Sequence, residues 1–387
     1  MRRAFTLVVL VSLAQLGVLV SPLPAASARS GGPACGETIT TDTVLLADLT
    51  DCPDSGIVIG ADDITLDLNG HTIDGDIALL DPCPVGTFCD LGVDNSAGHS
   101  GVTVVGGTVK EFGFGVVVGA ADENVLSRVT TTDNVLSGIL VFESVHLRIE
   151  HNTITRNGLD TDFSGIAAFA MRDGLIAHSR IADNGDIGLY AEGIDGNVID
   201  DNTMFGNPEA GMLFDGAGNV VSRNRLMAEG DGIVIAGDDN VVSNNRIAVS
   251  PGCPECGSGI SFEGGSRNLF ERNVISGARW GIRIDAFTGL ASDSTVRRNV
   301  VRGSLEDNIV VDREQAGPVE NTLVQDNTVV GAGDDGIDVR SLLTTISGNV
   351  AVRNHDLGIE AVPGVIDGGG NHAAANGNRQ QCTNVTC

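Results

Sequence analysis

A glycine followed by an apolar residue recurs at nearly regular intervals along most of this 387-residue chain. The members of the series lie 21 to 28 residues apart, and they are Gly115, Gly138, Gly165, Gly188, Gly211, Gly232, Gly259, Gly281, Asn308 in place of a glycine, Gly336 and Gly358. A period of this length is typical of solenoids, in which each unit stacks on the one before it. Equivalent side chains then form columns, so a functional site is sought within a column.

A second marker, Asn-x-apolar, falls between the glycine steps, at Asn152, Asn202, Asn224, Asn245, Asn273, Asn299 and Asn327. Asparagine tolerates tight bends and can bond its neighbours in a stack, so a repeated asparagine predicts a repeated corner. Between corners the apolar residues alternate, as in Gly232–Ala236, which indicates short strands. The intervening segments show no helical periodicity, which argues against leucine-rich repeats.

These two markers resemble the repeats of exported right-handed parallel β-helix proteins of the pectate-lyase-like superfamily, over roughly residues 60 to 375. The segment Ile64–Gly75 resembles an opening coil, and Gly368–His372 followed by Gln381–Cys387 resembles a C-terminal closure of bacterial members. The resemblance implies an all-β fold, a right-handed parallel β-helix solenoid with disulfide-tied N- and C-terminal caps. It indicates the reaction poorly, because such helices host lyases, hydrolases, epimerases and adhesins.

Four segments are expected. Residues 1–28 have Arg2 and Arg3, an apolar run and a small-residue cleavage pattern, so they predict a secretory signal peptide and a secreted, extracellular protein. Residues 29–60 are expected to form an N-terminal cap, 61–375 the β-helix and 376–387 a C-terminal disulfide tail. Residues 79–98 interrupt the rhythm and are expected to form a loop. No stretch after the signal is long and apolar enough to span a membrane.

The eight cysteines lie close together in pairs, which predicts local disulfides in an exported chain. The expected pairs are Cys35 with Cys52, Cys83 with Cys89, Cys253 with Cys256, and Cys382 with Cys387.

The formal net charge of −28 argues against nucleic acid, anionic membranes and polyanionic substrates as partners and allows a bound cation such as Ca²⁺. No cofactor is otherwise indicated, and we expect a monomer.

One column is acidic. The fourth residue after each glycine should point outward, and from Gly138 on this column contains Phe142, Phe169, Glu192, Asp215, Ala236, Glu263, Asp285, Asp312 and Arg340. Carboxylates stacked at strand spacing repel one another, which raises pKa values or favours Ca²⁺ or a hydroxyl-rich ligand. A solvated acidic face explains the column equally well.

The second residue after each glycine gives a neighbouring column with Tyr190, Arg283 and Asp338. Arg283 either neutralises the surrounding carboxylates or anchors a sugar, and Tyr190 either stacks on a sugar ring or covers the sheet. In the functional interpretation the catalytic residues are Glu263, Arg283, Asp285 and Asp312. The substrate-binding residues are then Tyr190, Glu192, Asp215, Asp338 and Arg340.

Two other features have structural interpretations. Leu140, Phe142, Phe169 and Leu213 also point outward, so we expect a chain segment to cover them. The pairs Asp62–Asp63, Asp238–Asp239 and Asp334–Asp335 could be the carboxylates of a glycoside hydrolase, but the other motifs of polygalacturonases are missing, so corner residues are the preferred interpretation.

The sequence therefore predicts a secreted β-helix protein that binds a polysaccharide or cell-surface glycan on one acidic face. Cleavage or rearrangement would make it a polysaccharide lyase, glycoside hydrolase or epimerase. The alternative is a non-catalytic structural or adhesion scaffold. Loops at 79–98, 156–164, 249–258 and 286–295 that wall the acidic face would favour the first interpretation.

Overall fold

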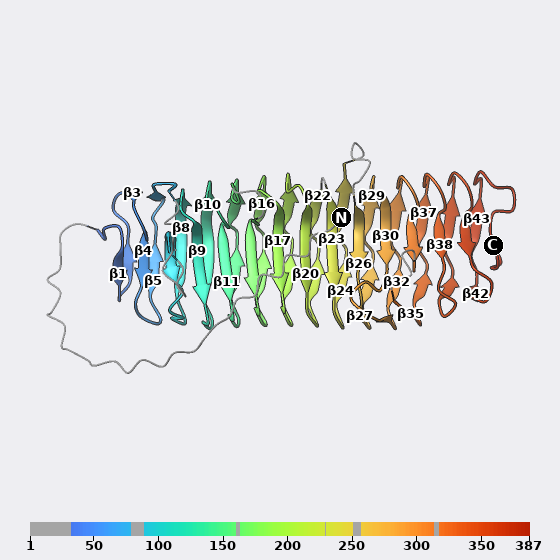
Figure 1. Ribbon diagram of the computed structural model, residues 1–387, viewed down its shortest axis with the longest axis horizontal. Helices are drawn as coiled ribbons and strands as arrows, with labels where there is room; N and C mark the ends of the chain where they lie inside the picture. The colour runs from blue at the N-terminus through green and yellow to red at the C-terminus, as the bar shows by residue number, and fades with distance from the viewer. Residues whose placement is uncertain (1–31, 79–88, 160–162, 229, 251–256, 313–316) are drawn as a thin grey trace.

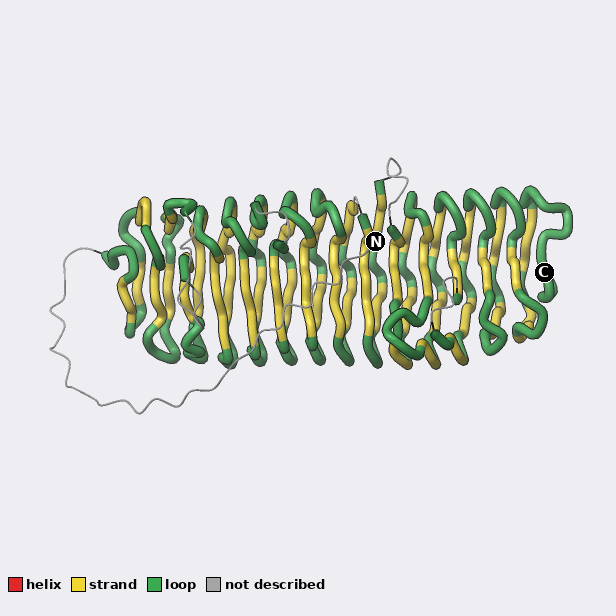
Figure 2. Tube along the Cα trace, in the orientation of Figure 1, coloured by secondary structure: helices red, strands yellow, loops and turns green. Residues whose placement is uncertain are grey.

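The computed structural model describes residues 32–78, 89–159, 163–228, 230–250, 257–312 and 317–387. Within these ranges every regular element is a β-strand, and the strands wind into a straight rod (Figures 1 and 2). All strand pairs are parallel, as expected for a β-helix; for example, Ile233, Ile260 and Ile282 lie side by side on successive coils. No stretch of the described residues forms a helix that could cross a membrane.

One long side of the rod is a 14-stranded parallel sheet, which we call the front sheet. At a spacing of about 4.8 Å between parallel strands, it extends for about 60 Å. In order, its strands are β1 (Glu37–Ile39), β4 (Ile57–Ile59), β7 (Leu91–Asn95), β9 (Phe114–Gly119), β11 (Ile139–Phe142), β14 (Ile166–Phe169), β17 (Ile187–Glu192), β20 (Ala210–Asp215), β23 (Asp231–Ala236), β26 (Ser258–Phe262), β30 (Trp280–Ile284), β34 (Ile309–Val311), β38 (Ile337–Val339) and β41 (Ile359–Ala361).

Two further rows of strands close each coil behind the front sheet, and β8 (Thr103–Lys110) and β10 (Val125–Thr132) run through both rows. The second row also contains β2 (Thr43–Val44), β5 (Thr65–Asp67), β12 (Arg148–Glu150), β15 (Leu175–Ala177), β18 (Val198–Asp200), β21 (Val220–Ser222), β24 (Val241–Ser243), β28 (Leu269–Glu271), β32 (Thr295–Arg297), β36 (Leu323–Gln325), β39 (Thr345–Ser347) and β42 (Ile366–Gly369). The third row contains β3 (Leu49–Cys52), β6 (Thr72–Gly75), β13 (Thr153–Thr155), β16 (Arg180–Ala182), β19 (Thr203–Phe205), β22 (Arg225–Ala228), β25 (Arg246–Val249), β29 (Val274–Ser276), β33 (Val300–Arg302), β37 (Thr328–Val330), β40 (Val350–Val352) and β43 (His372–Ala374). Three short strands, β27 (Gly265–Ser266), β31 (Ala291–Ser292) and β35 (Val319–Glu320), pair separately.

The core is a stack of aliphatic side chains from all three rows. The first residue after each glycine step points inward, and Ile233, Ile260, Ile282, Ile309 and Ile337 are all fully buried. Because strand side chains alternate between faces, the same alternation that places these residues inside places the second and fourth residues outside. The sequence prediction of an inward column at the first position is confirmed.

Buried asparagines bond along the rod between the second and third rows. Asn202, Asn224, Asn245 and Asn273 each donate from Nδ2 to the Oδ1 atom of the next asparagine, at 3.1 Å. Their backbone amides also donate to that Oδ1 atom, which confirms the expected asparagine stack. A buried amide group without a partner would cost free energy, so each asparagine of the ladder depends on a polar side chain at the same position of the next coil.

The left-handed residue of each corner precedes the ladder asparagine. Arg223, Asn244, Arg272 and Arg298 have φ angles of 56°, 57°, 53° and 55°. We had expected asparagine itself to supply the unusual conformation, and this expectation is wrong, because the ladder side chain must point inward while its neighbour turns the chain.

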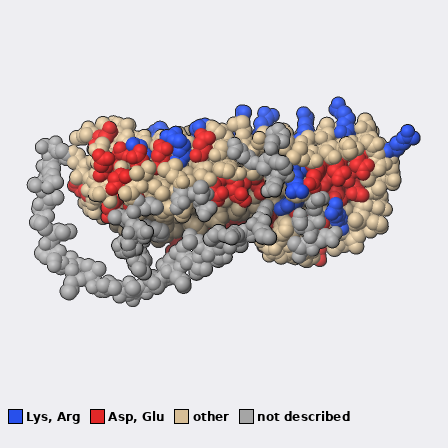
Figure 3. Space-filling view, turned by 45° about the horizontal axis from the view of Figure 1, so that its top comes forward, with Lys and Arg blue, Asp and Glu red and all other residues tan. Residues whose placement is uncertain are grey.

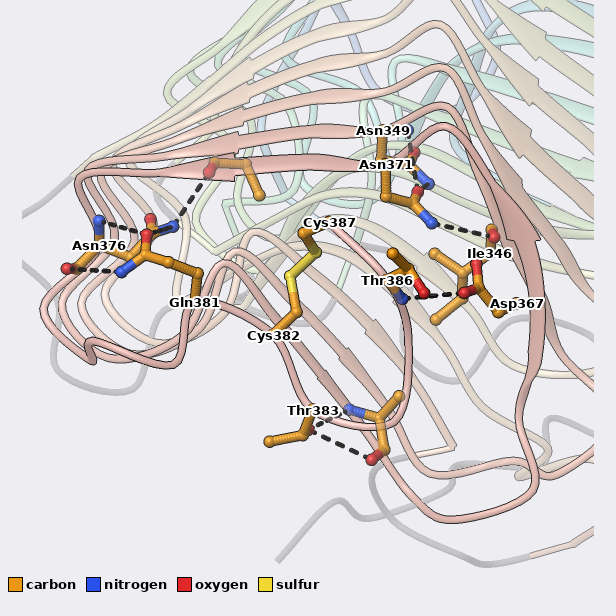
Figure 4. Close-up of a disulfide and its surroundings, with 12 residues drawn as sticks. Ile346, Asn349, Asp367, Asn371, Asn376, Gln381, Cys382, Thr383, Thr386 and Cys387 are labelled. Carbon is orange, nitrogen blue, oxygen red and sulfur yellow. Dashed lines mark hydrogen bonds between the residues drawn. A yellow bond between two sulfur atoms is a disulfide. The ribbon is translucent and has the colours of Figure 1, made fainter.

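Disulfides close both ends of the described rod, as predicted: Cys35 bonds Cys52, and Cys382 bonds Cys387. Figure 4 shows the C-terminal end, where Gln381 Oε1 accepts from both the backbone amide and Nδ2 of Asn376. Gln381 therefore takes the place of the next asparagine and ends one ladder.

The remaining predictions concern the loop at 79–98, the other four cysteines and the signal at 1–28. The expected loop at 79–98 is wrong for its last part, because Val93 packs in the core and β7 pairs with β4 and β9. Cys89 is disulfide-bonded. Its expected partner Cys83, the pair Cys253 and Cys256, and the signal at 1–28 lie outside the described residues.

Candidate functional site

The strand register brings the second-position residues of the front sheet together in one row. Ser261 pairs with Arg283, Arg283 with Val310, and Val310 with Asp338. Toward the N-terminus the same row runs through Tyr190 and Leu213.

The fourth-position residues lie at the ends of the same strands. The backbone amide of Asp285 donates to Phe262, which precedes Glu263, and that of Asp312 donates to Ile284, which precedes Asp285. Glu263, Asp285 and Asp312 are therefore neighbours on three successive coils, as the sequence predicted. Arg340 follows on the next coil, since its amide donates to Val311.

Arg283 lies among the carboxylates of this group. Its Nε atom is 3.2 Å from Asp285 Oδ2, and its Nη2 atom is 4.0 Å from Glu263 Oε1. Nη2 also donates to Ser261 Oγ, at 3.2 Å. The side chains of Arg283 and Asp285 are only 6% and 1% exposed, so this is a buried ion pair.

Asp312 has an environment that disfavours its charge. Burial and the neighbouring Asp285 raise its pKa, while Arg340 opposes the rise. Its Oδ1 atom is buried and accepts no hydrogen bond from the described residues. Arg340 itself pairs with Asp338, at 2.8 Å from Nη2 to Oδ2. A protonated Asp312 could donate a hydrogen bond, and an ionised one could accept a bond from a hydroxyl group.

The six residues Glu263, Arg283, Asp285, Asp312, Asp338 and Arg340 form one group, which we call the front cluster. It contains four carboxyl groups and two guanidinium groups, so its charge is −2 when all are ionised. All four residues predicted as catalytic and two of those predicted as substrate-binding lie in it.

Tyr190, Glu192 and Asp215 form a separate group nearer the N-terminus. The hydroxyl of Tyr190 donates to Glu192 Oε1, and burial raises the pKa of Tyr190. Strand β23, with Val234 and Ala236 facing outward, separates Asp215 from Glu263. At two strand spacings, or about 10 Å, the two groups do not touch but one extended chain could reach both.

The front face is less open than the sequence suggested. Arg283, Asp285 and Asp338 are buried, whereas Glu192 and Asp215 are exposed and Glu263, Asp312 and Arg340 are partly exposed. The expectation that the second and fourth positions all face solvent or a groove is therefore wrong. Any ligand would meet Glu263, Asp312 and Arg340 first.

Aromatic residues that the sequence analysis did not single out enclose Arg283. The guanidinium carbon lies 5.2 Å from the ring centre of Trp280 and 5.1 Å from that of Phe287. Trp280 Nε1 in turn donates to Glu306 Oε2, at 3.0 Å. Trp280 is the chain's only tryptophan and directly precedes Gly281, a signal that could have identified it.

One of the four expected loops flanks the cluster. After β30 the segment 286–290 turns over it, and the amide and the hydroxyl of Thr288 both donate to the carbonyl of Glu263. Large parts of the loops at 79–98, 156–164 and 249–258 lie outside the described residues. Among the described residues, a wall of the predicted cleft is therefore found on one side of the front cluster.

A second acidic group lies at the opposite end of β34. Asp307, Asp334 and Asp335 offer carboxylate oxygens within 4.8 Å of one another and could hold a metal ion. Burial, with Asp334, Glu360 and Asp307 nearby, raises the pKa of Asp335 to about 8, although Leu357 donates to it. Asp62–Asp63, Asp238–Asp239 and Asp334–Asp335 all lie outside the strands, as the corner interpretation predicted.

The apolar outer row near the N-terminus is largely buried. Leu91, Val117, Leu140 and Ala167 form a small cluster with Phe114, Phe142 and Phe169 against it. The covering segment that we predicted for this row is not found among the described residues, so it stays a prediction.

The chain belongs to the family of the right handed beta helix region, whose model matches residues 91–247 and 227–378. This agrees with the resemblance found in the sequence. No sequence among curated proteins matches the chain.

Several solved structures are similar in fold. The catalytic unit of a GH87 alpha-1,3-glucanase from Streptomyces thermodiastaticus is 15% identical over 87% of this chain and 63% of that chain, with a TM-score of 0.49. The surface adhesin PfbA of Streptococcus pneumoniae is 12% identical over 78% and 82%, with a TM-score of 0.48. The DFA-IIIase of Arthrobacter chlorophenolicus is 19% identical over 71% and 66%, with a TM-score of 0.43. The chain thus spans less than two thirds of the glucanase unit.

Proposed function

We propose that this protein acts outside the cytoplasm and binds a polysaccharide or cell-surface glycan along the front sheet, with the front cluster as the main contact. The observation that carries the proposal is the convergence of four carboxyl groups and two arginines at one place on the rod. Buried charged groups are costly, so their collection at one place is more typical of a functional site than of a surface selected for solubility.

The accessible groups define how a ligand would bind. Glu263, Asp312 and Arg340 are partly exposed, and Asp312 Oδ1 has unused hydrogen-bonding capacity among the described residues. Hydroxyl groups of a sugar can donate to Asp312 and Glu263 and accept from Arg340. Arg283 and Asp285 are too buried to touch a ligand directly, so we assign them the role of positioning Glu263.

The acid–base chemistry of a cleavage or rearrangement would use the same atoms. A carboxyl group with a raised pKa can act as a proton donor, and burial and the neighbouring Asp285 raise the pKa of Asp312. Glu263 is then the accompanying carboxylate. The net negative charge of the cluster favours neutral or cationic sugars over acidic ones, unless Ca²⁺ lies between them.

The test is binding of the purified chain to an array of neutral, cationic and acidic glycans, with Ca²⁺ and with a chelator. Asp312→Asn removes the titrating group at nearly constant shape. Asp326→Asn is the matched control, since Asp326 is exposed at a corner behind the front sheet. We expect Asp312→Asn to weaken binding about tenfold and the control to leave it unchanged. Absence of binding to every glycan in both conditions would contradict the proposal.

A non-catalytic scaffold is the second candidate function. The near-complete burial of Arg283 favours it, because its contacts with Ser261 and Glu263 on the preceding coil could serve only to hold the two coils together. In that case Asp312→Asn and Asp326→Asn should behave alike in every glycan assay.

A further inference from the structure

A basic surface runs along the side of the rod that lies behind the front sheet. It consists of the outer faces of the second and third rows and the corner between them, over the four coils from β21 to β33. Its members are Arg223, Arg225, Arg246, Arg272, Arg297, Arg298 and Arg302, and we call it the arginine ridge. Figure 3 shows such basic side chains projecting from one long edge, apart from the acidic patches.

The local charge of the ridge is opposite to that of the chain as a whole. Among the described outward-facing residues of these eight strands and their four corners, Glu271 is the only acidic one, so seven arginines against one glutamate give +6. The whole chain carries −28. A positive surface of this size on so acidic a chain is not explained by solubility, because negative charge already provides that.

Four of the seven arginines have no anionic partner in the described part of the chain. Arg272 and Arg297 both pair with Glu271, and Arg223 pairs with Asp200. Arg225, Arg246, Arg298 and Arg302 form no ion pair with any described residue and are exposed. Their guanidinium groups are therefore available to a partner.

The fold holds these charges close together. Arg225 and Arg246 are direct register partners on β22 and β25, about 4.8 Å apart along the rod. Like charges placed opposite each other on adjacent strands are unfavourable in the free protein. At the corner, the amide of Arg272 donates to the carbonyl of Arg297, which places Arg298 on the coil next to Arg272. A linear polyanion lying along the rod would relieve this repulsion at each coil.

We propose that the arginine ridge binds a linear sulfated polysaccharide that lies parallel to the rod axis. The ridge contains arginine and no lysine, and the guanidinium group is less strongly hydrated than an ammonium group and bonds oxyanions through two N–H groups. Sulfate esters are also weakly hydrated and stay ionised at any physiological pH. Single-stranded nucleic acid fits less well, because no aromatic side chain faces outward among the described residues of the ridge to stack on bases.

The experiment measures binding of the full chain to dextran sulfate, polygalacturonate and duplex DNA over a range of salt concentrations. The test variant is Arg225→Gln with Arg246→Gln. The control is Arg172→Gln with Arg353→Gln, which changes the net charge equally at exposed arginines on the other two corners. All four side chains are exposed, so both variants should keep the wild-type thermal midpoint.

We expect dextran sulfate to bind most tightly and its affinity to fall with added salt. The ridge variant should bind about tenfold more weakly for each arginine removed, with a salt slope reduced by about 2, while the control binds as the wild type does. The proposal is overturned if dextran sulfate does not bind, if the control loses as much affinity as the ridge variant, or if polygalacturonate or DNA binds more tightly. Because the ridge lies behind the front sheet, the Asp312→Asn variant should still bind dextran sulfate, so failure here is distinct from failure of the proposed front site.

Discussion

Replacing one asparagine of the ladder should destabilise the rod by more than the loss of one small polar side chain usually does. Asn224 is 1% exposed and takes part in four side-chain hydrogen bonds. Its Nδ2 atom donates to the carbonyl of Ile199 and to Asn245 Oδ1, at 2.8 and 3.1 Å. Its Oδ1 atom accepts from the backbone amide and Nδ2 of Asn202, at 2.9 and 3.1 Å.

Asn224→Ala removes all four bonds, but the damage is uneven. Asn202 Nδ2 still donates to Ile176, and Asn245 Oδ1 still accepts from the backbone amide of residue 224. The amide of Asn202 and the carbonyl of Ile199 each lose a partner inside the rod. At about 1–3 kcal/mol for each unsatisfied buried group, the expected loss is about 2–6 kcal/mol. This is a large part of the roughly 5–15 kcal/mol that stabilises a typical protein.

The measurement is equilibrium unfolding in urea, followed by circular dichroism, with Ser276→Ala as control. Ser276 is exposed on β29 in the third row, so its replacement should change the free energy of unfolding by less than about 0.5 kcal/mol. If Asn224→Ala were as mild as the control, the ladder would not stabilise the rod and the reasoning would be refuted.

Three further outcomes are expected. The pKa of Asp335 is raised to about 8, so the folded state holds a proton that the unfolded state releases near pH 4. The stability of the folded state should therefore fall as the pH rises from about 4 to about 8. Asp335→Asn should flatten this part of a plot of thermal midpoint against pH, whereas an unchanged slope would rule out Asp335 as its source. Arg283→Ala removes the Arg283 partner of the buried Asp285 carboxylate and should cost about 3–5 kcal/mol of unfolding free energy, more than the joint change Arg283→Met with Asp285→Leu; equal costs would show that the pair is not buried in solution. Replacing Cys382 and Cys387 with serine opens a short loop and should cost about 2 kcal/mol, seen by hydrogen exchange as faster opening of β43 than of β30; uniform exchange would contradict a local role for this disulfide.

The repeating features of the fold could be predicted from the sequence because every coil contains the same residue pattern. The stacked glycine steps, the asparagine stack and the inward column all follow from the repeat, and the register and hydrogen bonds confirm them. Features that occur once were missed. The strand at Leu91–Asn95 lies in a stretch without the repeat, and its place in the front sheet depends on contacts with β4 and β9.

The sequence predicted which residues form the candidate site but not how exposed their side chains are. Counting from each glycine placed Glu263, Asp285 and Asp312 on one face correctly. Burial of Arg283 depends on Trp280 and Phe287, whose rings reach it from a strand start and a loop where alternation no longer applies. The arginine ridge was missed because its members occupy several different positions of the coil, so counting from one repeat marker does not bring them together.

The most direct test of the front site is a crystal structure of the protein soaked with the oligosaccharide that it binds best on the array. The account predicts sugar density on the outer face of β26, β30 and β34, with hydroxyl groups within hydrogen-bonding distance of Glu263 and Asp312. Density confined to another face of the rod, with the front cluster in contact only with solvent, would contradict it.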